Sequence, residues 1–531
     1  MAYTTLPGVR VTLEDGFYAA TNALVDGNAD RVLIVAKAGP SANASVLRNP
    51  SIIWTGESEV VNAFGRGSDV HKAFQAAVKG GARNIFISAT DYAPAHAVIP
   101  ALTFGNFTAV ADATQDEYEL FLALENVSLA NPSVIIGYGY PATETVLDGD
   151  ISGAVARVAY YAAMFAQKAE DLTLEVGPAF AVLSVDTFED FYEKSVALYS
   201  ATVALGNADG VKTTFADATS SRWIRNGVVP VVTVAGVANP GAYTINYDSA
   251  SVTFAAAPAT GHAVTIANVY TVATASAYSG TYPVVAADVA TYVNWMVGAT
   301  LPSAEPVKPF PISSVTASVE AITDPSVEDS GLSKYLVLTL GDVQITNQVN
   351  EIGMGESEYM PACASVAGNT YRLPLDEAIT MKPLLNVTSI AFDMTPAQKI
   401  AIINKGAVPI GVSPSGLLVT VDGVTAAVPD DDGSPSVYNR LSTLRIVHEV
   451  IRGTRGQLEP FVGTTATTAR LNSIETKLRS YFMALKQNEL CKEIRFEMRY
   501  SISTSKLSVT ITVMPFGEIR DIEVTVDVVL Q

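Results

Sequence analysis

The chain is poor in the residues that build metal centres and disulfide frameworks. Among its 531 residues there are only two cysteines and four histidines. Cys363 and Cys491 lie far apart, and neither has a histidine or a second cysteine close by in the sequence, which is against a zinc site. The four histidines lack a partner at the spacing of a metal-binding helix or hairpin. We therefore predict two buried thiols and no metal site.

The motifs of nucleotide and acyl-transfer chemistry are missing as well. There is no Gly-x-x-x-x-Gly-Lys-Ser/Thr loop to hold phosphates. The Gly-Tyr-Gly-Tyr-Pro stretch at 137–141 lacks the third glycine of a dinucleotide site, and its proline interrupts the helix that such a site needs. Ser413 precedes a proline, which has no N–H to offer an oxyanion, and the acidic loop at 430–433 lacks the spacing of a calcium loop. We expect no enzyme activity and no cofactor.

Positive charge is scarce, and so are long uncharged runs. The 33 Lys and Arg residues are outnumbered by 53 Asp and Glu residues, which gives a net charge of −20. This balance is against nucleic-acid binding, because phosphate recognition needs a basic surface. Since no apolar run reaches about 18 residues without a charge, we expect no membrane insertion, and residues 1–8 have no apolar segment typical of a secretion signal. The length predicts three or four domains.

Residues 26–206 alternate apolar runs with helical patterns. Strands are predicted at 32–36 and 84–88, with a helix between them that has Asp69 as its N-cap and ends at Gly80-Gly81. Further helices are predicted at 116–126, at 151–170, and from Asp186 or Thr187 to about Leu205. This alternation favours an α/β domain with a mainly parallel sheet. Residues 272–384 are interpreted as its continuation, with a β and loop insertion.

Two further regions differ in character. Residues 207–271 are rich in β-branched residues, glycine and proline, and short strands recur about every ten residues, which predicts a small inserted β-sandwich. Residues 385–517 predict a C-terminal α+β domain. There, Thr395-Pro396 begins a helix, two longer helices carry apolar stripes, and strict alternation at 494–502 and 507–513 predicts a hairpin. The fold class is therefore α/β and α+β multidomain.

Both terminal regions contain a strand pattern without a neighbouring hairpin partner. In residues 1–25, Val9, Val11 and Leu13 alternate with polar residues. In residues 518–531, the alternating apolar positions are Ile522, Val524, Val526 and Val528. A lone strand is marginally stable, so each segment must pair with the chain's own sheet or with the sheet of another subunit.

Basic residues gather at 438–500, although the chain as a whole is acidic. Arg445 and Arg452 are seven residues apart, which places them on one helix face. The same spacing relates Lys477 to Arg470, and Lys486 to Arg479. Two interpretations remain open: a solvated helix face, or a docking face for an acidic partner.

Five pieces of sequence, taken in order, resemble the contractile tail sheath proteins of tailed bacteriophages. They are Pro7-Gly8-Val9-Arg10-Val11, the segment 70–82, the helix at 284–290, the run from 398 through Asp422-Gly423-Val424-Thr425, and Glu459-Pro460-Phe461 with the helix and strands after it. Ala407 and Val408 stand where the family more often has Val and Asn. The resemblance covers most of the chain outside 206–271 and about 307–380.

The resemblance implies a structural virion protein with a subtilisin-like but non-catalytic α/β domain. Such subunits form hexameric rings, stacked as a helical sheath around an inner tail tube, which contract to drive the tube through the host envelope for genome delivery. Their partners are copies of themselves, the tube protein, and the baseplate and tail terminator proteins, and they assemble in the host cytoplasm. The C-terminal domain is expected to face the tube, and residues 207–271 to lie on the outer surface.

The same resemblance assigns candidate roles to residues of this chain. Strand exchange between subunits is assigned to Val9, Val11, Leu13, Ile522, Val524, Val526 and Val528, and tube docking to Arg445, Arg452, Lys477, Arg479 and Lys486. Two alternatives remain: the sheath of a bacterial contractile injection system, and another structural virion or surface-layer protein.

Overall fold

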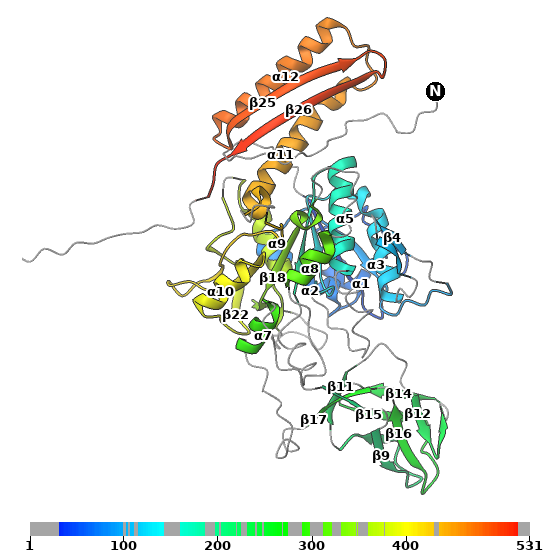
Figure 1. Ribbon diagram of the computed structural model, residues 1–531. Coiled ribbons are helices and arrows are strands. Elements are labelled where there is room, and N and C mark those ends of the chain that lie inside the picture. The colour runs from blue at the N-terminus through cyan, green and yellow to red at the C-terminus, as the bar shows by residue number, and fades with distance from the viewer. Residues whose placement is uncertain are drawn as a thin grey trace, which may run out of the picture. The chain divides into compact units, whose positions relative to one another are not determined.

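The computed structural model describes the chain in two compact units (Figure 1). The described residues are 31–98, 102–104, 107–110, 115–142, 160–185, most of 197–273, 289–297, 312–320, 331–346, 348, 359–375, 377–429 and 435–518. One unit comprises Met1–Ala142, Ala159–Val185 and Ile312–Gln531, and the other Thr143–Val158 and Asp186–Pro311. Both candidate strand-exchange segments lie outside the described residues.

A nine-stranded mixed sheet forms the centre of the first unit. Its order is β2 (Ile53–Trp54), β3 (Ile85–Thr90), β1 (Val32–Lys37), β6 (Val134–Gly137), β7 (Phe180–Ser184), β18 (Leu336–Leu340), β23 (Ala407–Val412), β24 (Leu418–Thr420) and β21 (Lys382–Pro383). Neighbours from β3 to β23 pair in parallel, whereas the pairs at both edges are antiparallel. The predicted parallel centre is confirmed.

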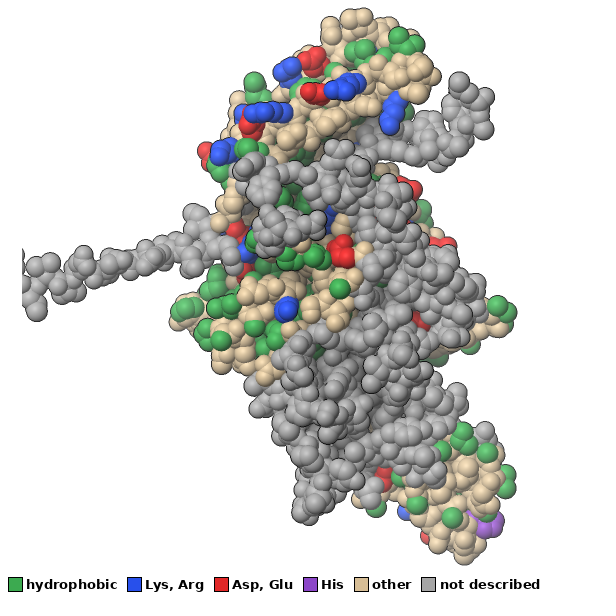
Figure 2. Space-filling model, in the orientation of Figure 1, with side chains coloured by type: hydrophobic (Ala, Val, Ile, Leu, Met, Phe, Trp, Pro, Cys, Tyr) green, Lys and Arg blue, Asp and Glu red, His purple; other side chains and the backbone are tan. Residues whose placement is uncertain are grey.

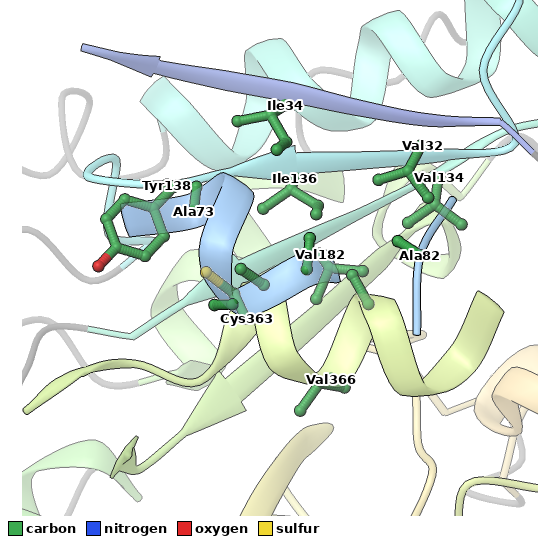
Figure 3. Packing of buried hydrophobic residues seen from close by; sticks show 14 of the residues in the cluster. Val32, Ile34, Ala73, Ala82, Val134, Ile136, Tyr138, Val182, Cys363 and Val366 are labelled. Atoms are coloured by element: carbon green, nitrogen blue, oxygen red, sulfur yellow. The ribbon is translucent and has the colours of Figure 1, made fainter. Parts of the chain in front are cut away.

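The inner strands β1, β3, β6, β7 and β18 are mostly apolar and are buried along almost their whole length, because helices cover both faces of the sheet. Figure 3 shows Val32, Ile34 and Ile136 on the strands beside Ala73 of the helix pair that covers one face, and Val366 of that pair belongs to the same buried cluster. That pair is α2 (Asp69–Gly80) and α9 (Cys363–Arg372). Side chains of the alternate strand positions meet α3 (Gln115–Glu125) and α5 (Tyr160–Glu175) on the opposite face.

Helix α2 shows how local sequence sets an element's ends. Its N-cap is Ser68, whose hydroxyl accepts the N–H of His71, so the predicted cap at Asp69 is one residue late. The helix ends as predicted, because Gly81 takes a φ of +120°, which disfavours other residues. At the same end Gly80 meets Gly368 of α9 so closely that neither position has room for a Cβ.

Smaller elements complete the edge of this unit. They are α1 (Glu57–Phe64), the pair β4 (Leu102–Phe104) and β5 (Phe107–Val110), η1 (Asn126–Leu129), α8 (Ile312–Glu320), η2 (Leu332–Tyr335), the sheet of β20 (Met360–Pro361), β19 (Asp342–Ile345) and β22 (Val387–Ile390), and α10 (Pro396–Ile403). The predicted start of α10 is confirmed. Thr395 accepts the N–H of Gln398, and the Gln398 side chain accepts the N–H of Thr395 in return, which is a full capping box.

The C-terminal part of this unit is built from two helices and one hairpin. Helices α11 (Leu441–Leu458) and α12 (Thr468–Gln487) are linked by the short turn η4 (Glu459–Phe461). Strands β25 (Cys491–Ser501) and β26 (Lys506–Pro515) pair in antiparallel register, with Phe496 opposite Ile511, so the predicted hairpin is confirmed. Their apolar side chains pack on Leu478 and Phe482 of α12.

In its described residues, the second unit contains three small antiparallel sheets and a helix. The sheets are β13 (Val237–Ala238), β12 (Val231–Val234), β16 (Ala263–Ala267) and β9 (Val203–Asn207); β10 (Thr214–Ala216), β15 (Ser251–Phe254) and β14 (Tyr243–Asn246); and β11 (Ser220–Ile224), β17 (Val269–Ala273) and β8 (Ala197–Ser200). The helix is α7 (Val289–Met296). Phe215, Trp223 and Val252 lie in its buried core.

Two predicted helices need correction. The helix predicted to run to about Leu205 is wrong from residue 197 onward, because β8 and β9 occupy that stretch and pair with β17 and β16. These partners lie more than 55 residues away in the sequence, so long-range pairing overrides the local helical pattern. The helix predicted at 151–170 is described only from Tyr160 and extends to Glu175.

Candidate functional site

The hairpin of β25 and β26 has two different faces. Ile494, Phe496 and Met498 point toward α12, since alternate residues of a strand face the same side. The opposite face carries Arg495, Glu497 and Arg499 on β25, opposite Thr512, Thr510 and Ser508 on β26. Figure 2 shows Lys and Arg side chains interspersed with Asp and Glu over this part of the molecule. The hairpin is thus an apolar sheet on one side and a mixed-charge surface on the other.

Ion pairs run along the outer face of β25. Arg495 Nε lies 2.8 Å from Glu493 Oε1, and Arg499 Nη2 lies 3.1 Å from Glu497 Oε2. The hydrogen bond from Arg495 is the largest influence on the pKa of Glu493, which it lowers. Both arginine side chains are at least three quarters exposed, so these pairs contribute little to stability and remain accessible to a partner.

Another strand could pair with either outer edge of this hairpin. In the part of the chain that the structure describes, the sheet consists of β25 and β26 alone. Each strand therefore presents one row of backbone N–H and C=O groups that no further described strand covers. At 11 and 10 residues, the strands are long enough for another strand to pair along them.

The candidate tube-docking residues on α11 do not share the environment of those on α12. Arg445 is 7% exposed, and its guanidinium donates to the carbonyl oxygens of Leu373 at 2.6 Å, Glu377 at 3.2 Å and Pro374 at 3.4 Å. This side chain ties α11 to the chain that follows α9. Its role is internal, and the expectation that it lies on an open docking face is not supported by this geometry.

Arg452 is also engaged within the chain. Its guanidinium pairs with Glu449 at 3.3 Å and donates to the carbonyl oxygen of Pro178, also at 3.3 Å. Arg455, one turn further along, donates to the carbonyls of Thr173 and Leu174 at the end of α5. The regularly spaced arginines of α11 therefore hold this helix against neighbouring segments of the first unit.

The candidate residues on α12 are exposed. Lys477 Nζ lies 5.0 Å from the centre of the Phe461 ring, and Arg479 pairs with Glu475 at 2.7 Å, one turn before it on the same helix. Lys486 lies on the exposed part of the last turn. The structure thus brings Lys477, Arg479 and Lys486 onto one accessible helix and separates them from Arg445.

Two of the four histidines, His71 and His96, each pair with a carboxylate. His71 Nε2 lies 3.0 Å from Glu57, and His96 Nε2 lies 2.7 Å from Glu119. Cys363 and Cys491 are both buried, as predicted, and burial raises the pKa of their thiols to about 11 and about 12. Among the described residues, no cluster of His, Cys, Asp and Glu has the geometry of a metal site, and no helix combines the length and apolar character needed to span a membrane.

One feature of this region was missed by sequence reasoning. His448, a residue of α11, is buried beside the rings of Phe180 and Tyr335, whose centres lie 6.2 and 6.1 Å from its own. Burial, reinforced by the charges of Arg452 and Lys334, lowers the pKa of His448 to about 3. The only local signal was its place between Val447 and Glu449 on a helical stripe, which does not reveal the ring partners from β7 and η2.

No protein-family model matches the chain, and no curated protein matches it in sequence. Among solved structures, it is similar to contractile sheath proteins. The helical sheath of the anti-feeding prophage in its contracted state has a TM-score of 0.47 and 10% identity, over 99% of each chain. The contracted sheath complex of the extracellular contractile injection system PVC has a TM-score of 0.47 and 8% identity, over 99% of this chain and 98% of that one. A sheath tail protein from Listeria innocua has a TM-score of 0.41 and 8% identity, over 93% of each chain.

Proposed function

We propose that this chain is the subunit of a contractile tail sheath, of the bacteriophage type or of the related injection-system type. The observation that carries the proposal is the C-terminal hairpin, whose two outer edges have no strand partner among the described residues. The chain has a strand pattern near each terminus, around Val9–Leu13 and Ile522–Val528. The number of uncovered edges equals the number of terminal segments with a strand pattern, and each such segment could supply the backbone hydrogen bonds that one edge offers.

Strand exchange explains how such subunits would join. Each terminal segment adds as a strand to the hairpin of a neighbouring subunit, and the backbone hydrogen bonds hold the contact while the side chains set the register. The two surfaces of the contact differ, so it is heterologous and builds rings and helical assemblies. We propose hexameric rings stacked around an inner tube, with the α/β unit as a subtilisin-like domain that performs no catalysis.

Contraction then needs no bound nucleotide. The extended lattice would be held kinetically and released by the baseplate, and new contacts between rings would supply the work. This mechanism agrees with a sequence that has no phosphate-binding loop. Virion location, a tail terminator partner and delivery of a genome through the host envelope belong to the same proposal.

A pair of matched substitutions tests the exchange. Val526→Lys places a charge on the apolar side of the C-terminal strand pattern, whereas Thr525→Lys places the same charge on the other side. We expect the purified wild-type chain and T525K to form hollow tubes in negative-stain electron microscopy, and V526K to remain a folded monomer. Normal tubes from V526K, or equal loss from both variants, would refute the proposed register.

Tube docking is proposed for Lys477, Arg479 and Lys486 on α12. The combined K477E and K486E variant should weaken assembly templated by the tube protein and make it less sensitive to salt, because fewer counterions are displaced. Lys405→Glu, at an exposed position after α10, is the control. Equal assembly by all three proteins would leave α12 as a solvated helix.

A further inference from the structure

We propose that Glu518 is a positioning residue that fixes the end of the hairpin, and with it the point from which residues 519–531 continue. Glu518 follows β26 by three residues, and its side chain is only 10% exposed. Its Oε1 accepts from Arg440 Nη1 at 3.2 Å, and its Oε2 accepts from the Ser442 hydroxyl at 3.3 Å. These contacts reach back 78 and 76 residues in the sequence, so they join the end of the hairpin to the start of α11.

A second carboxylate completes the cluster. Asp422 Oδ1 accepts from the same Arg440 Nη1 at 2.6 Å, and its side chain is 4% exposed. The Thr380 hydroxyl accepts the N–H of Gly423 at 3.1 Å and lies within 3.4 Å of both carboxylates. Since a hydroxyl has one proton, Thr380 donates to one carboxylate at a time.

The cluster joins segments from three parts of the first unit. Thr380 precedes the edge strand β21, and Asp422 follows β24, the strand that pairs with β21. Arg440 is the N-cap of α11, and it also forms an isolated antiparallel bridge with Val424. Glu518 therefore anchors the chain after β26 to the edge of the central sheet as well as to the helix.

Glu518 restrains the chain after β26 more strongly than the residues between it and the strand do. Pro515 is the last residue of β26 and pairs with Cys491. Gly517 is exposed, and a Cβ added to it would meet nothing within 4 Å. Residues 516–518 lie between the last paired residue, Pro515, and residue 519. At about 3.4 Å per residue, this segment would let residue 519 move by roughly 10 Å in any direction if the Glu518 contacts were lost.

The contacts of Glu518 do not require its negative charge. Two carboxylates share one guanidinium, and burial, which outweighs the opposing effect of Arg440, raises the pKa of Glu518. A neutral side chain of the same length can fill this site, because Asp422 alone still pairs with Arg440. A shortened side chain cannot reach Arg440 or Ser442.

This inference rests on the proposed function for its consequence. If residues 519–531 pair with a neighbouring hairpin, a fixed origin directs them to that hairpin and reduces the chain entropy lost on pairing. Glu518 then acts on assembly without touching the neighbouring subunit.

The test measures the position of the segment in the monomer. Spin labels on Asp521→Cys and Lys405→Cys report a distance distribution by double electron–electron resonance, because both native cysteines are buried. Three further changes are compared in the full chain: Glu518→Ala, Glu518→Gln, and Glu497→Ala on the exposed face of β25 as control. We expect at least a twofold broader distribution in E518A, and wild-type width in E518Q and E497A.

Each result has a defined meaning. Wild-type width in E518A, with circular dichroism confirming the fold, would overturn the inference, as would equal broadening in E497A. Tube formation is scored separately by electron microscopy, and we expect E518A to form at least tenfold fewer tubes than E518Q. If the wild-type chain forms no tubes with or without the tube protein, the proposed function fails, while the distance distributions still decide the role of Glu518.

Discussion

Helices α2 and α9 approach each other so closely that replacing a helical glycine there by alanine should lower the stability of the fold instead of raising it. A Cβ at Gly368 would stand 2.5 Å from the carbonyl oxygen of Ala77 and 2.9 Å from the Cα of Gly80. Ordinary contact begins near 3.4 Å, so Gly368→Ala must push the two helices apart by close to 1 Å. Both neighbouring atoms belong to a helix backbone and cannot swing aside as a flexible side chain would.

The magnitude follows from two opposing effects. Overpacking of a tight core costs about 1–3 kcal/mol, and a gap of 0.5–1 Å around the contact loses roughly a quarter to a half of the attraction between the atoms that line it. Alanine recovers about 1 kcal/mol through its higher helix propensity. Because the clash is with backbone atoms of α2, we expect the upper part of the range and a net loss of about 2 kcal/mol.

A second helical glycine supplies the control. Gly456 lies in α11, and a Cβ there would meet nothing within 4 Å. Gly456→Ala should therefore show only the propensity gain and stabilise the chain by about 1 kcal/mol. The same chemical change in two helices is expected to have opposite signs.

Thermal unfolding followed by circular dichroism measures both variants. At roughly 2 °C per kcal/mol for a unit of this size, the midpoint should fall by about 4 °C in G368A and rise by about 2 °C in G456A. Faster hydrogen exchange in peptides from α2 and α9 of G368A would show that the loss of stability arises at this helix contact. If G368A raises the midpoint as G456A does, the two helices do not approach each other as described.

Three further predictions concern single side chains. His448 is neutral in the fold with a pKa of about 3, whereas the unfolded chain binds a proton near pH 6.5, so its stabilising effect is complete above pH 6.5 and is lost as the pH falls toward 3. Urea unfolding of wild type and His448→Phe at pH 7 and pH 5 should show a smaller acid loss in the variant, and equal losses would contradict the assignment. Tyr481→Phe removes the hydroxyl that donates to the Glu449 carbonyl at 3.0 Å and should cost about 1 kcal/mol in the same assay. Thr395→Ala removes the capping box of α10 and should cost about 1 kcal/mol, seen as faster hydrogen exchange in the first turn of that helix; unchanged exchange would show that the cap is dispensable.

The local sequence pattern predicted an element correctly where the burial of its faces, or a cap formed by neighbouring residues, determines that pattern. The alternation from Ile494 to Ile502 predicts β25 because one face of the hairpin packs on α12 while the other stays in water. The apolar run at Val32–Ala36 predicts an inner strand because helices cover both faces of the sheet. Thr395 followed by proline predicts the start of α10 because capping involves only neighbouring residues.

The sequence by itself therefore determined the elements whose stabilising contacts are local or periodic: the parallel-sheet strands, the capped helices and the hairpin. Tertiary structure alone decided that β8 and β9 are strands, because they pair with β17 and β16. It also decided that Arg445 is an internal side chain, and that Glu518 meets Asp422 and Arg440. The physical reason is the same in each case, because the deciding partner lies tens of residues away and only the packed fold brings it within hydrogen-bond distance.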